Sequence, residues 1–297
     1  MMSTRSILLF ALTVLLGRGE VLAQELTFSK ETFTATTMTL PYRKATIPGN
    51  GERAALIVYL HGGTSKGNDN EAQLLEPCVT DISLWLADNK RKAIMLVPQC
   101  PKDKSWLGPT QDALVQLLQS YVDRGAADAA KVYILGGSMG GTGTWNMISA
   151  HPGLFAAAMP VAGNPTGLDA AAVAQTPLYT VMGTADNIMK IPAVQDFLQL
   201  MDAYDADYRF DTEDGWTHED TCKKSYTANR LNWLFAHTRS GETGIRPVTG
   251  ADSAQPTQVM WHTIGGQRLA SAPSQHGIYV KTAVFADGHH SSEKVCL

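Results

Sequence analysis

A serine enclosed by glycines is the residue of this chain best suited to covalent chemistry. The segment Gly136-Gly137-Ser138-Met139-Gly140 follows the apolar run 132–135 and precedes residues with a helical pattern. A serine hydroxyl becomes a good nucleophile only when a base removes its proton, and a tight strand-to-helix turn exposes its oxygen at the edge of a sheet. This setting favours a nucleophile over a glycine-rich turn with an incidental serine. The lack of a G-K-[ST] sequence argues against a phosphate-binding loop.

Two residues that could activate Ser138 follow it in the chain. Asp186 comes after the apolar run 178–182, which would bring it to the same sheet edge, and His218 lies beyond the run 208–211, in a loop before the last expected helix. We expect His218 to act as base and Asp186 to fix the histidine tautomer and stabilise the imidazolium. A helix-capping role for Asp186 and a surface position for His218 stay open. Asp169 is a weaker rival for the acid, since no clear strand precedes it.

Backbone amides must bind the negative charge that develops on an attacked carbonyl. Met139, directly after Ser138, is one expected donor. The second is expected in the sequence His61-Gly62-Gly63-Thr64 after the apolar run 56–60, with Gly63 as first choice and Thr64 as second, because the glycines allow close backbone approach. A simple turn is the alternative for this segment.

The other histidines indicate no further chemistry. His237 closes an expected helix, where a cation interacts favourably with the helix dipole, and His151 precedes Pro152 at another helix end. The pair His289-His290 is only a weak suggestion of a metal site because no further ligands accompany it, and we expect no metal.

The pattern of apolar runs predicts a mixed α/β fold with a mostly parallel sheet flanked by helices on both faces, preceded by one or two antiparallel strands within 34–47. Continuous short apolar runs are typical of strands covered on both sides. Their alternation with helical spacing favours this class. Buried strands are expected at 55–60, 93–97, 131–135, 156–161, 178–182 and 208–211, and helices at 111–122, 142–150, 192–204 and 225–237.

The two ends of the chain differ from its middle. Residues 1–23 read as a secretory signal peptide, with an apolar run at 6–16 that is too short to span a bilayer. We expect a catalytic domain at 24–239, a linker rich in Gly, Thr, Ser, Ala and Pro at 240–258, and a short C-terminal tail at 259–297 with two short strands. The expected location is secreted, periplasmic or cell surface.

Composition restricts the partners. The formal net charge of −4 gives no electrostatic basis for binding nucleic acid or anionic membranes, so a neutral or weakly charged substrate is expected. In an oxidising compartment the four cysteines Cys78, Cys100, Cys222 and Cys296 could pair in three ways, among which the sequence does not choose. A cysteine nucleophile is disfavoured because Ser138 is better placed.

Residues 136–160, with Leu60-His61-Gly62-Gly63 and the sequence VPQCP at 97–101, resemble secreted esterases related to polyhydroxybutyrate depolymerases and feruloyl esterases. The resemblance extends over about 54–237. It implies an α/β-hydrolase without cofactor that cleaves acyl esters, such as feruloyl or acetyl groups on plant polysaccharide, with Ser138, Asp186 and His218 as the triad. Trp106 and Trp216 fall where an aromatic near the acyl pocket is implied, although ordinary buried tryptophans are an equal alternative. The candidate pocket residues are Thr64, Trp106, Asn164 and Trp216.

The tail carries a second resemblance. The sequences MWHTIGGQRL at 260–269 and HGIYV at 276–280 are similar to C-terminal sorting tails of Bacteroidota type IX secretion, which implies contact with a secretion machinery, although 281–297 departs from that pattern. A terminus without function is the alternative. For the whole protein two further readings stay open: a serine peptidase of the prolyl-oligopeptidase kind, and an inactive glycan-binding protein at the cell surface.

Overall fold

The computed structural model describes residues 26–239 and, further along the chain, 258–263, 268–269, 271–275, 278–284 and 290–296. The expected signal peptide and residues 240–257 of the expected linker lie outside the described residues. The chain divides into two compact units, Met1–Ile245 and Arg246–Leu297, and each is described by itself.

The first unit is built on an eight-stranded sheet in the order β1-β2-β4-β3-β5-β6-β7-β8. The strands from β4 to β8 in that order run parallel, and β2 lies antiparallel between β1 and β4. The expected mostly parallel sheet is therefore confirmed. The strands are β1 Ser29–Thr34, β2 Thr39–Ile47, β3 Asn50–Leu60, β4 Arg91–Pro98, β5 Ala127–Gly137, β6 Ala157–Val161, β7 Leu178–Gly183 and β8 Tyr208–Glu213.

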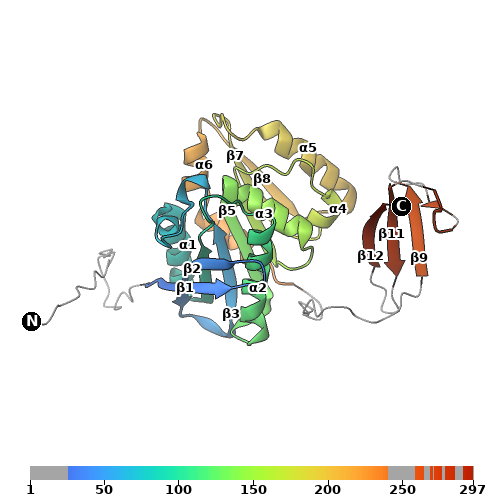
Figure 1. Ribbon diagram of the computed structural model, residues 1–297. Helices are drawn as coiled ribbons and strands as arrows, with labels where there is room; N and C mark the ends of the chain where they lie inside the picture. Colours follow the sequence, from blue (N-terminus) through green and yellow to red (C-terminus); the bar gives the residue numbers. More distant parts are fainter. Residues whose placement is uncertain are drawn as a thin grey trace, which may run out of the picture. The chain divides into compact units, whose positions relative to one another are not determined.

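Helices cover both faces of this sheet (Figure 1). One face packs against α2, α3, α4 and α5, and the other against α1 and α7. The helices are α1 Pro77–Asp88, α2 Pro109–Asp123, α3 Met139–Ala150, α4 Ala170–Val173, α5 Ile191–Met201, α6 His218–Lys224 and α7 Ala228–Leu234, with short 3-10 turns η1 Gly63–Ser65, η2 Ala72–Leu75 and η3 Asp202–Tyr204.

The two layers follow from the alternation of side chains along a strand. In β3, Leu56 and Val58 belong to the core under α2 and α3, whereas Ile57 and Tyr59 belong to the core under α1 and α7. Successive side chains of a strand point to opposite faces. A strand covered on both sides therefore needs apolar residues at every position, which is the pattern that the sequence shows.

Two helical expectations need correction. The segment expected as one helix at 225–237 is α7, and a separate helix α6 begins at His218 itself. The helix α1 was not expected, although Val79, Ile82 and Leu86 repeat at helical spacing and Pro77 suits a first turn.

The strand order reverses between β3 and β5. From β3 the chain crosses to β4 on one side, and the later parallel strands add on the other side. In open α/β sheets this reversal leaves a crevice at the carboxyl ends of the two strands. The segment after β3 begins at His61 and the segment after β5 begins at Ser138, so the fold brings both to this crevice.

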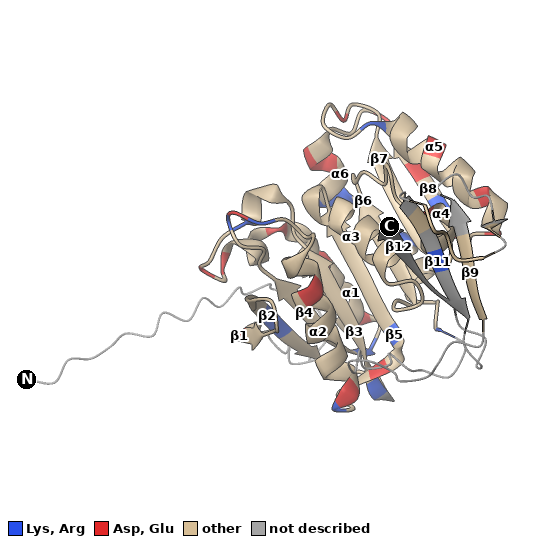
Figure 2. Cartoon of the chain, turned by 45° about the vertical axis from the view of Figure 1, so that its right-hand side comes forward, with Lys and Arg blue, Asp and Glu red and all other residues tan. Residues whose placement is uncertain are grey.

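The second unit is a four-stranded antiparallel sheet in the order β10-β9-β11-β12, formed by β9 Gln258–Thr263, β10 Arg268–Leu269, β11 Ile278–Val284 and β12 His290–Cys296. It holds more strands than the two expected in the tail. Within the described part of the chain, no helix is both long and apolar enough to cross a membrane. Basic and acidic residues are interspersed along the first unit rather than gathered by sign (Figure 2).

Candidate active site

Ser138, His218 and Asp186 form a continuous hydrogen-bonded chain. Nε2 of His218 lies 2.7 Å from the Ser138 hydroxyl oxygen, and Nδ1 of His218 lies 2.7 Å from Oδ2 of Asp186. The Asp186 side chain is fully buried and that of His218 is 16% exposed. The three side chains come from the ends of β5 and β7 and from the start of α6, so residues 80 positions apart meet at one sheet edge.

The backbone at Ser138 has the strained geometry of a tight strand-to-helix turn. Its φ of 58° and ψ of −118° lie in a region that non-glycine residues rarely adopt. The Ser138 N–H donates to the Val161 carbonyl at 3.0 Å, and its carbonyl accepts from Thr142 in the first turn of α3. These bonds hold the conformation, which presents the hydroxyl to the crevice.

The glycines around Ser138 are required by close backbone contacts. A Cβ at Gly140 would lie 1.8 Å from the Leu60 carbonyl oxygen, and a Cβ at Gly136 would lie 2.5 Å from the Gly140 carbonyl oxygen. No side chain fits at these distances, so α3 approaches the end of β3 only because both positions lack a side chain.

Asp186 combines two tasks in the loop after β7. While Oδ2 faces His218, Oδ1 accepts hydrogen bonds of 2.8 Å from the N–H groups of Ile188 and Met189. These three hydrogen bonds hold the carboxylate in an orientation that faces the imidazole. The rival Asp169 instead caps α4, where it accepts from Ala171 and Ala172.

His218 is the first residue of α6 and not part of a loop before a helix. Thr217 caps α6 by accepting from the N–H of Asp220, and the Asp220 carboxylate accepts in return from the N–H of Thr217. This capping box fixes the turn that carries His218. The ring is therefore positioned by regular structure rather than by a flexible segment.

The loop after β3 lies beside the nucleophile. Gly63 and Ser138 line the same cavity, and a Cβ at Gly62 would lie 3.6 Å from Cβ of Ser138. Met139 opens α3, so its N–H has no acceptor within the helix. Gly63 and Met139, the two residues expected to supply oxyanion donors, thus line the same cavity as Ser138, whereas Thr64 is exposed.

His61 is a buried structural residue of this loop. Its Nε2 accepts from the N–H of Cys100 at 2.9 Å, so the proton resides on Nδ1, which donates to the Gly62 carbonyl at 2.6 Å. Burial lowers the pKa of His61, so the ring stays neutral. Trp106 completes the arrangement by donating from Nε1 to the His61 carbonyl at 3.0 Å.

A cavity of about 300 Å³ opens beside Ser138. Its lining includes the expected residues Gly63, Trp106, Ser138 and Met139, together with residues that sequence reasoning missed: Ser105, Leu107, Thr142, Gly143 and Met189. No Lys, Arg, Asp or Glu is among these lining residues. Apolar positions next to candidate residues were the available signal, since Leu107 follows Trp106 and Met189 lies three residues after Asp186.

Three of the expected pocket residues do not line this cavity. Thr64 is exposed, and the Asn164 side chain accepts from the N–H and hydroxyl of Thr166. The Lys224 ammonium lies 5.7 Å from the centroid of the Trp216 ring. Asn164 and Trp216 thus contact residues close to them in the chain, and closeness in sequence to the triad was a poor guide to the lining of the cavity.

Cys78, Cys100 and Cys222 are free thiols, and Cys296 belongs to β12. Burial raises the pKa of Cys222 to about 12 and that of Cys100 to about 11, which leaves neither as a thiolate nucleophile. His237 is held by the Trp233 carbonyl and by Asp207. Among the described residues no His, Cys, Asp or Glu group could hold a metal, and His289 lies outside them.

The chain was compared with protein families, curated proteins and solved structures. Residues 89–233 match the model of the dienelactone hydrolase family. This segment runs from β4 into α7 and includes all three residues of the hydrogen-bonded chain. None of the curated proteins compared with the chain matches it.

Solved structures share the α/β-hydrolase fold. A thermostable esterase superposes with a TM-score of 0.64 at 24% identity, over 71% of this chain and 63% of its own. The chain thus spans less than two thirds of that esterase. The feruloyl esterase module from Clostridium thermocellum, determined as an S954A mutant complexed with sinapinate, superposes with a TM-score of 0.58 at 15% identity, over 74% of this chain and 91% of its own. A puromycin-hydrolyzing peptidase from Mycobacterium tuberculosis superposes with a TM-score of 0.57 at 16% identity, over 74% of this chain and 41% of its own.

Proposed function

We propose that this protein is a serine carboxylesterase in which Ser138 is the nucleophile, His218 the base and Asp186 the acid. The observation that carries the proposal is the unbroken chain from Asp186 through His218 to Ser138, with 2.7 Å at each step, beside a cavity bordered by two backbone amides. This arrangement of nucleophile, base and orienting carboxylate is the set of parts that acyl transfer requires.

The reaction proceeds in two halves. His218 Nε2 takes the Ser138 proton as the oxygen attacks the ester carbonyl carbon, and the Gly63 and Met139 amides hold the resulting oxyanion. The carbon–oxygen bond to the alcohol then breaks, and His218 returns the proton to the leaving oxygen. Water attacks the acyl-serine with the same base, which releases the carboxylic acid and restores the Ser138 hydroxyl.

The cavity favours a neutral acyl group. Its walls include Leu107, Met139 and Met189, and no charged side chain among its lining residues would pair with a carboxylate on the substrate. A substrate that carries a carboxylate is therefore a poorer candidate than a feruloyl or acetyl ester of plant polysaccharide. The feruloyl esterase module among the similar structures supports this choice, as a likeness of fold.

Hydrolysis of a peptide is the second candidate, because the fold is shared with a peptidase. The match covers 41% of that enzyme, so the likeness is limited to a part of the peptidase. The third reading is an inactive glycan-binding protein. Such a protein would have no need of the hydrogen bonds from Asp186 through His218 to Ser138, nor of the strained backbone at Ser138.

The test is a substrate panel with purified protein: p-nitrophenyl esters from acetate to octanoate, methyl ferulate, and aminoacyl p-nitroanilides. We expect ester hydrolysis that Ser138→Ala reduces at least about 1,000-fold, with little cleavage of the anilides. Full activity in Ser138→Ala would remove Ser138 as nucleophile. Preferential cleavage of the anilides would favour the peptidase, and retention of xylan without any cleavage would favour the binding protein.

Export is a separate part of the proposal. We propose that residues 1–23 direct secretion and that the four-stranded second unit serves as a sorting tail. Expression of the full chain in a bacterium with type IX secretion, next to a chain truncated after residue 245, tests this. Equal appearance of both proteins in the medium would show that the second unit has no part in sorting.

A further inference from the structure

Glu76 lies between η2 and α1, close to the loop that borders the nucleophile. Its Oε1 accepts hydrogen bonds of 2.8 Å from the Gly62 N–H and from the Ser65 hydroxyl, and its Oε2 accepts at 2.6 Å from the Tyr59 hydroxyl. Oε1 would also lie 3.6 Å from a Cβ at Gly62, which places it directly against the backbone of the loop. None of these bonds is used by the reaction described above.

The three partners of Glu76 are all donors. Burial raises the pKa of Tyr59 well above its ordinary value, so this hydroxyl stays protonated and donates to the carboxylate. The Tyr59 oxygen in turn accepts from the Cys78 thiol at 2.8 Å. Glu76 therefore acts purely as a hydrogen-bond acceptor in these three contacts.

The loop that Glu76 holds is conformationally free by its own sequence. Gly62 and Gly63 both lack a side chain, so the peptide that joins them has a low cost of rotation. Its carbonyl accepts from His61 Nδ1 at 2.6 Å and from the Ser65 N–H at 3.3 Å. In a trans peptide the N–H points away from the carbonyl, so these bonds direct the Gly63 N–H to the opposite side.

Glu76 restrains both ends of this peptide. It binds the Gly62 N–H on one side and the hydroxyl of Ser65 on the other, and Ser65 is the residue whose N–H holds the Gly62 carbonyl. Loss of Glu76 would leave the Gly62 N–H and the Ser65 hydroxyl without their acceptor, so that the two consecutive glycines would be held only through the Gly62 carbonyl, by His61 Nδ1 and the Ser65 N–H.

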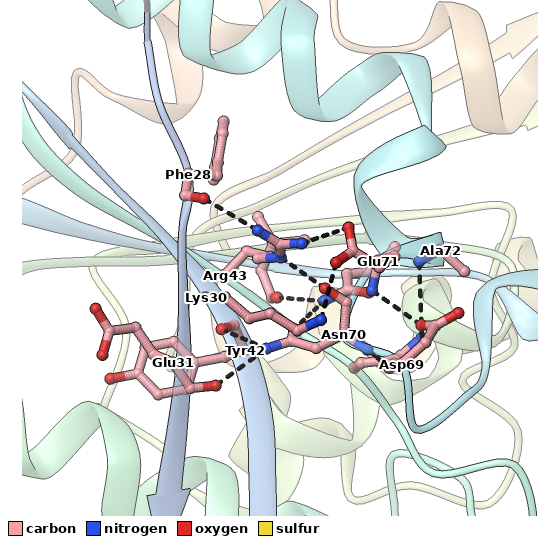
Figure 3. Close-up of polar contacts among 12 residues, drawn as sticks. Phe28, Lys30, Glu31, Tyr42, Arg43, Asp69, Asn70, Glu71 and Ala72 are labelled. Carbon is pink, nitrogen blue, oxygen red and sulfur yellow. Dashed lines mark hydrogen bonds and ion pairs between the residues drawn. The ribbon is translucent and has the colours of Figure 1, made fainter. Parts of the chain in front are cut away.

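Glu76 itself is carried by a fixed segment. Asn70 is buried and its side chain donates to the carbonyls of Glu31 and Tyr42, while its own carbonyl accepts from Arg43 at 2.6 Å (Figure 3). Gln99 binds Asp69 and the Asn70 N–H. The segment 66–76 is thus attached to β1 and β2, and Glu76 meets the loop from a rigid support.

We propose that Glu76 is a positioning residue, which holds the Gly62–Gly63 peptide so that the Gly63 N–H faces the oxyanion formed at Ser138. The proposal rests on the proposed esterase function. Glu76 touches no reacting atom and acts through the loop. A preorganised donor stabilises the transition state more than the substrate, because the full negative charge exists only there.

The experiment compares Glu76→Ala and Glu76→Gln with the wild type. We expect Glu76→Ala to lower kcat about 10- to 100-fold with KM within about threefold, because the oxyanion donor is no longer held in place. Glu76→Gln keeps a carbonyl oxygen for the Gly62 N–H, so it should retain activity within about threefold. Phenylboronic acid, which forms a tetrahedral adduct with the serine, should bind Glu76→Ala more weakly by a factor that parallels the loss of kcat/KM.

The inhibitor separates positioning from damage to the fold. A variant that is partly unfolded shows a lower kcat but an unchanged inhibition constant, because the remaining active molecules are normal. Glu71→Ala is the matched control: Glu71 is a carboxylate of the same segment that pairs with Lys30 and Arg43 away from the cavity. It should keep both kcat and the inhibition constant.

The proposal is overturned if Glu76→Ala retains kcat and the inhibition constant within twofold, or if Glu76→Gln loses as much activity as Glu76→Ala. A loss of kcat in Glu76→Ala with an unchanged inhibition constant overturns it as well. Ester hydrolysis by the wild type that is lost in Ser138→Ala establishes the function independently, so a failure of the Glu76 variants would leave the esterase assignment intact.

Discussion

The indole of Trp106 donates a hydrogen bond of 3.0 Å to the His61 carbonyl, while the two rings meet edge to face with 5.0 Å between their centroids. Trp106 is 1% exposed and also lines the cavity beside Ser138. One side chain therefore lines the cavity beside Ser138 and also restrains the loop that carries Gly63.

Trp106→Phe tests this double role. The ring is retained in part, but the His61 carbonyl loses its donor in a buried place, which costs about 1–3 kcal/mol of stability. We expect a lower kcat together with an earlier urea midpoint. Trp85→Phe is the control, because Trp85 stacks on Phe235 in the other core layer. A kcat in Trp106→Phe equal to that of Trp85→Phe would contradict the link to the loop.

Asp186→Asn should impair chemistry with little change in binding. An amide no longer selects the histidine tautomer or stabilises the imidazolium, which costs about 10,000-fold in kcat in enzymes with this triad. KM should stay within about threefold. Asp169→Asn serves as control because Asp169 only caps α4. Equal activities of the two variants, measured with p-nitrophenyl acetate, would exclude Asp186 as the acid.

Gly140→Ala and Gly63→Ala should differ sharply in stability. The new methyl group at Gly140 meets the Leu60 carbonyl oxygen at 1.8 Å, whereas a Cβ at Gly63 meets nothing within 4 Å. We expect a loss of more than about 3 kcal/mol for Gly140→Ala and less than about 1 kcal/mol for Gly63→Ala, because backbone atoms of a sheet cannot yield. Urea unfolding followed by circular dichroism measures both. Similar midpoints would refute the described packing of α3 on β3.

Met189 should set the size of the acyl group. It lines the cavity, and its position is fixed by the bond from its N–H to Asp186. Met189→Ala removes several heavy atoms from the wall. The ratio of kcat/KM for octanoate over acetate should therefore rise about 10-fold or more, since each methylene in an apolar pocket is worth about 1–3 kcal/mol. Ile188→Ala is the matched control, because Ile188 is 65% exposed and does not line the cavity. An unchanged ratio would place the acyl chain elsewhere.

The start of α6 should respond to acid. The pKa of Asp220 is lowered from an ordinary value of 3.8 to about 2. The hydrogen bond from Lys224 makes the largest contribution, followed by the hydrogen bonds from Thr217. Because the folded pKa is the lower one, the stabilisation from Asp220 is present above about pH 4 and is lost as the pH falls toward 2. The urea midpoint of the wild type should exceed that of Asp220→Asn at pH 5, and the difference should shrink on acidification. A difference that grows toward low pH would contradict the capping box.

The local parts of the site could be predicted because short segments specify them. Glycines around Ser138 between an apolar run and a helical stretch allow little else than a tight turn, and Met139 follows by its position in that turn. The parallel sheet could likewise be read from continuous apolar runs, which only strands covered on both faces require. Sequence order then suggested an aspartate and a histidine after later strands.

Tertiary structure decided the relations between segments that are distant in the chain. The sequence already ranked Asp186 above Asp169, but the contact between Asp186 and His218 exists because β5, β6 and β7 are neighbours in the sheet. Glu76 carries no motif, and its three donors come from β3 and the loop after it. The cavity is lined by both Leu107 and Met189, which lie far apart in the chain. Contacts of this kind depend on strand order and helix packing, which no local pattern encodes.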